Sequence, residues 1–121
     1  MSVTAAEGFV AAGCHAGIKR RRHDMALLAT EDRKPVACAA VFTQNRFVAP
    51  PVVLSRARLA DNGGRAAAVI VNSGNANACT GEAGLRAAVA TTRAAAKLLD
   101  MAPENVVPAS TGVIGQLLPD E

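Results

Sequence analysis

Apolar positions recur at spacings of three and four residues in the second half of the chain, as on one face of an α-helix. The stretch GEAGLRAAVATTRAAAKLLD, residues 81–100, carries basic residues on another side, and Pro103 follows it. The apolar face comprises Leu85, Ala88, Val89, Thr92, Ala95, Ala96 and Leu99. The pattern predicts a helix over residues 81–100 with Thr80 as its N-cap, although the spacing of a capping box is absent.

Short apolar runs bounded by polar, Gly or Pro residues predict strands in the rest of the chain. The expected elements are a strand broken near Gly13, a hairpin over residues 25–45, a brief strand into a short helix over residues 52–61, and strands over residues 66–72 and 106–111. The two prolines before residue 52 are expected to interrupt regular structure. Strands followed by a long helix and another strand indicate one layered α+β domain over residues 1–121.

Half of the residues are apolar but only 2% are aromatic, so small aliphatic side chains must fill the interior. Few aromatic rings also weigh against single-stranded nucleic-acid binding, in which bases stack on such rings. The net charge of +3 owes much to one run, KRRRH at residues 19–23. We interpret this run as a solvated loop, with contact to an anion or a substrate as the alternative.

Three cysteines stand far apart and form no C-x-x-C pair, which argues against a disulfide framework or a zinc site. Cys79 as a nucleophile, with His15 or His23 as its base, is a weak candidate for catalysis. No apolar stretch reaches the ~20 residues of a membrane span, and a signal peptide is not recognisable. We therefore expect a cytoplasmic protein with no metal, no cofactor and no membrane or nucleic-acid partner.

Amide and hydroxyl side chains crowd the junction between the strand at residues 66–72 and the long helix. They are Asn72, Ser73, Asn75, Asn77 and Thr80. Such a junction can line a ligand site, because the first amides of a helix point outward without partners. The same residue types also bond to nearby backbone and hold a loop in shape, so both interpretations stay open.

A second strand end, ASTGVIG at residues 109–115, combines hydroxyl groups with a flexible backbone. The Thr111 hydroxyl and the Gly112 N–H could stabilise a developing oxyanion, where the loss of one donor can cost ~3 kcal/mol. A tight turn is the structural alternative. Asp24 and Glu31 are expected to be ordinary surface acids.

Two long runs, VIVNSGNANACTGEAGL at residues 69–85 and VVPASTGVIGQLLP at residues 106–119, closely resemble the glutamate N-acetyltransferases, also called ornithine acetyltransferases. The segments GFVAAGCHAGIK, DMALLAT and AAVFTQNRFVAPPV also look like the opening part of that family, so the resemblance covers nearly the whole chain. It implies a DmpA-like, N-terminal-nucleophile-like fold. It also implies a precursor that cuts itself into an α and a β chain, which stay together as an α2β2 heterotetramer or a larger oligomer.

The same resemblance implies ping-pong acetyl transfer. The new N-terminal Thr of the β chain would take the acetyl group of N-acetylornithine, release ornithine and pass the acetyl group to glutamate, with its own amino group as base. By family likeness, Thr111 gives its hydroxyl and Gly112 its backbone N–H to the oxyanion. Whether acetyl-CoA also serves as a donor stays open.

The family's cleavage site would lie beyond Glu121, so we expect most of an α chain, without the nucleophile and inactive alone. The loop Asn72–Asn77 is expected to shape the site and support the donors. Two alternatives remain. One is a self-processing amidohydrolase or aminopeptidase of the same fold, which would release the acyl group to water, and the other is a non-catalytic assembly fragment.

Overall fold

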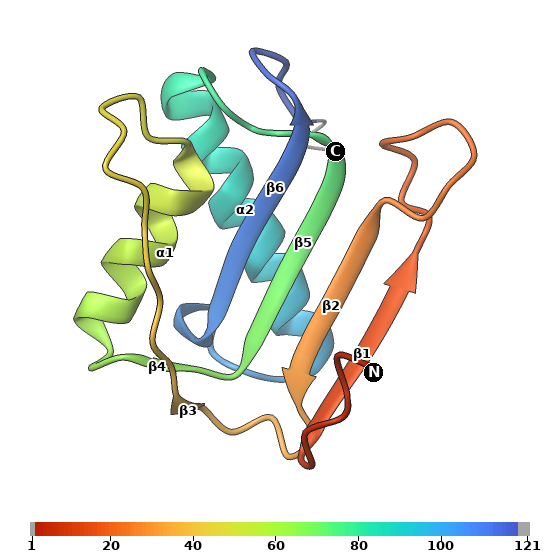
Figure 1. Ribbon diagram of the computed structural model, residues 1–121, viewed down its shortest axis with the longest axis vertical. Coiled ribbons are helices and arrows are strands. Elements are labelled where there is room, and N and C mark those ends of the chain that lie inside the picture. Colours follow the sequence, from red (N-terminus) through yellow and green to blue (C-terminus); the bar gives the residue numbers. More distant parts are fainter. Residues whose placement is uncertain (1, 119–121) are drawn as a thin grey trace.

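The strands within residues 2–118 form two sheets (Figure 1). A computed structural model describes residues 2–118, so the two ends of the expected domain 1–121 lie outside the described residues. The larger sheet has four strands in the order β1-β2-β5-β6, and β3 pairs with β4 in the smaller one. The elements are β1 Phe9–Cys14, β2 Met25–Thr30, β3 Val36–Ala37, α1 Pro50–Asp61, β4 Arg65–Ala66, β5 Ala68–Asn75, α2 Gly81–Leu99, the 3-10 turn η1 Pro103–Asn105, and β6 Val106–Val113. The combination of helices and a mixed sheet confirms the α+β class.

Helix α2 confirms the strongest pattern in the sequence and crosses one face of the larger sheet (Figure 1). Small side chains of α2, among them Ala95 and Ala96, pack against Ala68 and Ile70 of β5 and Val106 of β6. Val106 is completely buried. The core is therefore a close-packed layer of small aliphatic residues, as the low aromatic content predicted.

Strands β5 and β6 are parallel, whereas β1, β2 and β5 pair antiparallel. A parallel pair needs a crossover between its strands, and α2 supplies it. The carboxyl ends of β5 and β6 consequently lie at the same edge of the sheet. The loop between β1 and β2 also lies at this end of the molecule (Figure 1).

The expected hairpin over residues 25–45 is wrong. Strand β2 pairs with β1 on one side and with β5 on the other. Of the second apolar run only Val36–Ala37 is a strand, which pairs with β4, and residues 38–49 form neither helix nor strand. Pairing with β5 packs Leu27 and Ala29 of β2 into the core, so burial decided the partner of β2 rather than nearness in sequence.

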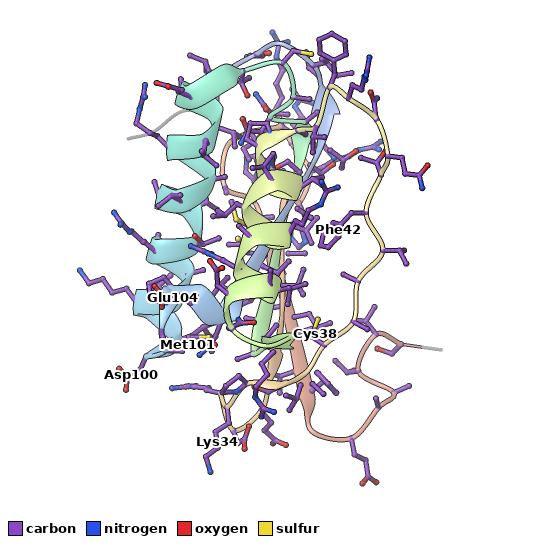
Figure 2. All side chains as sticks on the ribbon, turned by 90° about the vertical axis from the view of Figure 1, so that its left-hand side faces the viewer. Lys34, Cys38, Phe42, Asp100, Met101 and Glu104 are labelled. Carbon is purple, nitrogen blue, oxygen red and sulfur yellow. The ribbon has the colours of Figure 1, made fainter. Side chains whose placement is uncertain are left out.

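The strand expected near residue 52 is also wrong, because α1 begins at Pro50. The two prolines occupy the first turn of this helix, where a missing N–H leaves no hydrogen bond unmade. Ser55 and Arg58 of α1 donate hydrogen bonds to the carbonyls of Pro108 and Val106, at 3.1 and 2.6 Å. Helix α1 thereby covers part of the β6 edge, the edge that faces the viewer in Figure 2.

No helix among residues 2–118 covers the other face of the larger sheet (Figure 1). Ile70 and Val106 lie in the core with α2. Alternation along the strands therefore places Val69, Val71 and Val107 on the opposite face, where they are half-buried. We call this surface the open face.

Candidate functional site

The two polar motifs meet at the carboxyl ends of β5 and β6. The parallel pairing aligns Ser73 with Thr111 and Gly74 with Gly112, although α2 separates these residues in the sequence. Both strands continue through these positions, so the predicted loop and tight turn are wrong for this part of each motif. The site is an extended sheet end with a bulge at Asn75.

The asparagines of the first motif are buried and hold the junction in shape. The exposed fractions of Asn72, Asn75 and Asn77 are 5%, 3% and 0%. The Asn72 amide donates to the Asn75 carbonyl at 2.8 Å, the Asn75 amide to the Gln116 carbonyl at 2.8 Å, and the Asn77 amide to the Gly84 carbonyl at 2.9 Å. These bonds to backbone carbonyls favour the structural interpretation of the three side chains.

Thr80 stands at the N-cap position of α2, as predicted, but its side chain caps no helix amide. Its hydroxyl donates instead to Asn77 Oδ1 at 2.8 Å. Gly84 leaves space for this pair, because a Cβ at that position would overlap Thr80 Oγ1 and Asn77 Oδ1. The start of α2 is thus tied to the asparagine loop.

Thr111 and Gly112 are exposed at the end of β6. Gly112 has a φ of 135°, a conformation that side chains other than glycine rarely adopt. A Cβ on Gly112 would also lie 2.6 Å from the backbone nitrogen of Asn75. Only glycine therefore permits this close approach of β6 to β5.

The backbone N–H of Gly112 points away from β5. Helix α1 bonds to the carbonyls of Val106 and Pro108 from the side of β6 that faces away from β5. The carbonyl of Val113 accepts a bond of 2.8 Å from the N–H of Ala76, which follows β5. Because peptide groups alternate in direction along a strand, the Gly112 N–H points to the same side of β6 as the carbonyls of Val106 and Pro108, away from β5. The Thr111 hydroxyl is a second exposed hydrogen-bond donor at this strand end.

Asp24 is buried, so the expectation of an ordinary surface acid is wrong. Its carboxylate accepts bonds from the backbone N–H groups of Lys19, at 2.7 Å, and Ala16, at 2.6 Å, and His15 Nδ1 lies 3.2 Å away. The pKa of Asp24 is lowered from 3.8 to about 2, mainly by the hydrogen bond from the Lys19 N–H. Burial of the carboxylate raises the pKa, whereas the Ala16 N–H and His15 lower it further. The basic run thus folds around an ionised carboxylate.

The same loop reaches the two motifs. The backbone carbonyl of Asp24 accepts a bond of 2.7 Å from the Ser73 N–H, and the Lys19 ammonium donates to Ser73 Oγ at 2.5 Å. The sequence singled out the run at residues 19–23, but no local pattern showed which of its charges would face the sheet end. Sequence reasoning therefore missed Asp24, and it offered Lys19 only within a run whose alternative interpretation was contact with an anion or a substrate.

The structure does not bring the candidate nucleophile Cys79 together with a histidine base. Cys79 is an exposed free thiol, and the cleft beside it contains no histidine among its lining residues. His15 is hydrogen-bonded to Asp24 and to the carbonyl of Arg22.

Within residues 2–118, no three His, Cys, Asp or Glu side chains form a group that could hold a metal ion. No helix in that range is long and apolar enough to cross a membrane.

Comparison with known proteins gives one consistent result. The sequence model of the ArgJ family matches residues 10–121. The arginine biosynthesis bifunctional protein ArgJ of Bifidobacterium longum is 51% identical over 98% of this chain and 30% of that protein. The protein of the same name from Symbiobacterium thermophilum is 52% identical over 97% of this chain and 29% of that protein. The chain therefore spans less than a third of the length of these curated relatives.

Two crystal structures resemble the fold closely. The arginine biosynthesis bifunctional protein ArgJ of Bacillus halodurans superposes with a TM-score of 0.91 at 42% identity, over 98% of this chain and 61% of that chain. Ornithine acetyltransferase of Mycobacterium tuberculosis, in complex with ornithine, superposes with a TM-score of 0.87 at 44% identity, over 97% of this chain and 62% of that chain.

Proposed function

Because the chain belongs to the ArgJ family, we propose that it is part of a glutamate N-acetyltransferase, which moves an acetyl group from N-acetylornithine to glutamate. The curated relatives are named for arginine biosynthesis. One similar structure is an ornithine acetyltransferase that holds ornithine, the product of the first half-reaction. These names support a role in arginine biosynthesis, and we propose that the protein acts in the cytoplasm.

Thr111 and Gly112 donate hydrogen bonds to the oxyanion of this reaction. The observation that carries this assignment is the direction of the Gly112 N–H, away from β5, beside the exposed Thr111 hydroxyl. Donors fixed before the reaction stabilise the tetrahedral intermediate without reorganisation, and each contributes ~3 kcal/mol. The tight contact of Gly112 with β5 keeps one of these donors fixed.

The reaction is a ping-pong transfer through an acyl-threonine on the β chain. The hydroxyl of the N-terminal Thr attacks the acetyl carbonyl, and its own amino group takes the proton. The C–N bond then breaks and ornithine leaves with a proton. The amino group of glutamate attacks the acyl-threonine in the second step, which restores the hydroxyl and releases N-acetylglutamate.

The partner of this chain is the β chain of the same precursor, which packs on the open face. Two observations support this assembly. Val69, Val71 and Val107 form an apolar face that no helix of residues 2–118 covers. This chain matches 30% of the length of the Bifidobacterium longum protein but 61% of the crystallised Bacillus halodurans chain. The crystallised chain is therefore about half as long as the curated relative. A precursor that is cut into two chains of similar length would produce a chain of about half the full length.

The test is an assay of the complete two-chain protein with N-acetylornithine and glutamate. We expect N-acetylglutamate as product, and parallel lines in double-reciprocal plots at several fixed glutamate concentrations. Release of free acetate at the same rate without glutamate would favour the amidohydrolase alternative. An uncut protein without turnover would favour the assembly fragment. The same assay with acetyl-CoA in place of N-acetylornithine decides whether the enzyme also accepts acetyl-CoA as an acetyl donor.

A further inference from the structure

We propose that the ammonium group of Lys19 binds the α-carboxylate of the acetyl donor and of the acceptor. Lys19 belongs to the basic run between β1 and β2 and lies beside the Thr111 and Gly112 donors. The inference rests on the proposed acetyl transfer and adds to it the group that recognises the amino-acid part of both substrates.

The position of Lys19 follows from Ser73. The Lys19 ammonium lies 2.5 Å from Ser73 Oγ, and Ser73 is aligned with Thr111 across the parallel pair. Neighbouring strands are about 4.8 Å apart, and aligned residues of two neighbouring strands place their side chains on the same face. The ammonium therefore stands within about one or two strand spacings of the Thr111 hydroxyl.

The charge of Lys19 has no partner in the described chain. The close contacts between basic and acidic side chains within residues 2–118 join His15 to Asp24 and Arg86 to Glu82. The Asp24 carboxylate accepts the backbone N–H of Lys19 and not its ammonium. Lys19 is half-buried, and a half-buried cation gains most from an anion that arrives with the substrate.

The loop fixes Lys19 before any substrate binds. Asp24 bonds with its carboxylate to the Lys19 N–H and with its backbone carbonyl to the Ser73 N–H. Gly74 gives the lysine room, since a Cβ there would lie 3.1 Å from Lys19 Cγ and 2.9 Å from Ile18 Cγ2. A side chain held in this way loses little conformational freedom on binding.

The two proposed substrates share one charged group close to the reacting atoms. The acetyl group sits on the α-nitrogen, so the α-carboxylate lies within about 5 Å of the carbonyl oxygen. Glutamate presents its α-amino group and α-carboxylate in the same arrangement when it takes the acetyl group. The side chains differ in charge, a cation in ornithine and an anion in glutamate. A cation beside the oxyanion donors therefore recognises the part that both substrates have in common.

The experiment compares N-acetylornithine with its neutral α-carboxamide as acetyl donors for the complete enzyme. We expect the wild type to prefer the carboxylate in kcat/KM by roughly 10- to 100-fold, the range of a charge-assisted bond. Lys19→Met removes the charge at similar length and is expected to abolish the preference, whereas Lys19→Arg retains part of it. The preference is a ratio within one preparation, so it does not depend on the fraction of folded enzyme.

Lys34→Met is the matched control, because Lys34 is an exposed lysine beyond the opposite end of β2 (Figure 2). Lys34→Met should keep the wild-type preference for the carboxylate donor. A wild-type preference in Lys19→Met would overturn the inference. If Lys19→Met gives no active enzyme, Ser73→Ala is the second variant, because it removes the hydrogen-bond partner of the Lys19 ammonium. It should lower the preference for the carboxylate several-fold. An unchanged preference in Ser73→Ala also overturns the inference. A wild type that transfers no acetyl group would instead count against the proposed function.

Discussion

Gly112 combines a φ of 135° with a position directly against the β5 backbone, so two physical constraints act on one residue. Its neighbour Thr111 has the opposite character, with an exposed side chain that makes no structural contribution comparable to that of the buried asparagines. At this scale the site divides into residues that hold the sheet end together and residues to which we assign contact with the substrate. Substitutions in the first group should lower the stability of the protein, and substitutions in the second group should lower the reaction rate.

Gly112→Ala should destabilise the protein by roughly 2–4 kcal/mol, from backbone strain together with overlap of the new methyl group with β5. Gly115→Ala is the matched control, because Gly115 also has a positive φ, of 80°, but nothing lies within 4 Å of the added Cβ. The control should cost about 1 kcal/mol. Urea unfolding of both variants measures the difference, and equal losses would show that the contact with β5 is unimportant.

Thr111→Ala in the complete enzyme should lower kcat by roughly 100-fold or more with a smaller change in KM, since the hydroxyl acts mainly on the oxyanion. Thr111→Ser keeps the hydroxyl and should retain most of the rate. Steady-state kinetics of the two variants provide the comparison. A kcat that survives the loss of the hydroxyl would remove Thr111 from the oxyanion role.

At the scale of elements, the loop between β1 and β2 shows how one buried carboxylate organises a basic segment. Asp24 accepts N–H groups from the loop and bonds through its backbone to Ser73 of β5. The loop, two strands and the site are therefore joined through a single residue. Its contribution to stability depends on the carboxylate being ionised.

Asp24→Asn should destabilise the protein at neutral pH, because an amide cannot accept the loop N–H groups as strongly as a carboxylate. The pKa of Asp24 is lowered from 3.8 to about 2. Its stabilising effect is therefore complete above about pH 4 and is lost as the pH falls from about 4 to about 2. The urea midpoints of wild type and variant should converge over that range.

Asp61→Asn at the exposed end of α1 is the control for this experiment and should change the midpoint little at any pH. Midpoints of wild type and Asp24→Asn that stay equally far apart from pH 6 down to pH 2 would contradict the role of the ionised carboxylate.

At the scale of the whole molecule, the helices of residues 2–118 cover only one face of the larger sheet. Helix α2 packs on one face and α1 on the β6 edge (Figure 1). The open face carries half-buried valines. A layered α+β protein normally buries such a face against a further layer. The proposed β chain is that layer.

Val71→Lys places a charge on the open face and should prevent stable assembly of the two chains, because the ammonium would be buried without a partner. Ala90→Lys, on the exposed side of α2, adds the same charge elsewhere and should leave assembly intact. Size-exclusion chromatography with intact-mass analysis of the complete protein measures this. A normal complex with Val71→Lys would place the partner on another surface.

The sequence and the structure agree where one local pattern dominates. The long helix, the buried strand before it and the strand after it follow from periodicity and apolar runs, and α2, β5 and β6 occupy those places. The hairpin over residues 25–45 and the strand near residue 52 were wrong. In both cases the deciding interaction is distant in sequence, with β5 as the partner of β2 and β6 as the support of α1.

The sequence by itself determined the class of the fold, the small-residue core, the family and the two motifs, because each depends on residue types at fixed local spacing. Only the tertiary structure decided which side chains meet. The alignment of Ser73 with Thr111, the burial of Asp24 and the bond from Lys19 to Ser73 join segments that lie far apart along the chain. Such contacts arise when apolar faces are buried together and remaining polar groups must find partners, which no local pattern encodes.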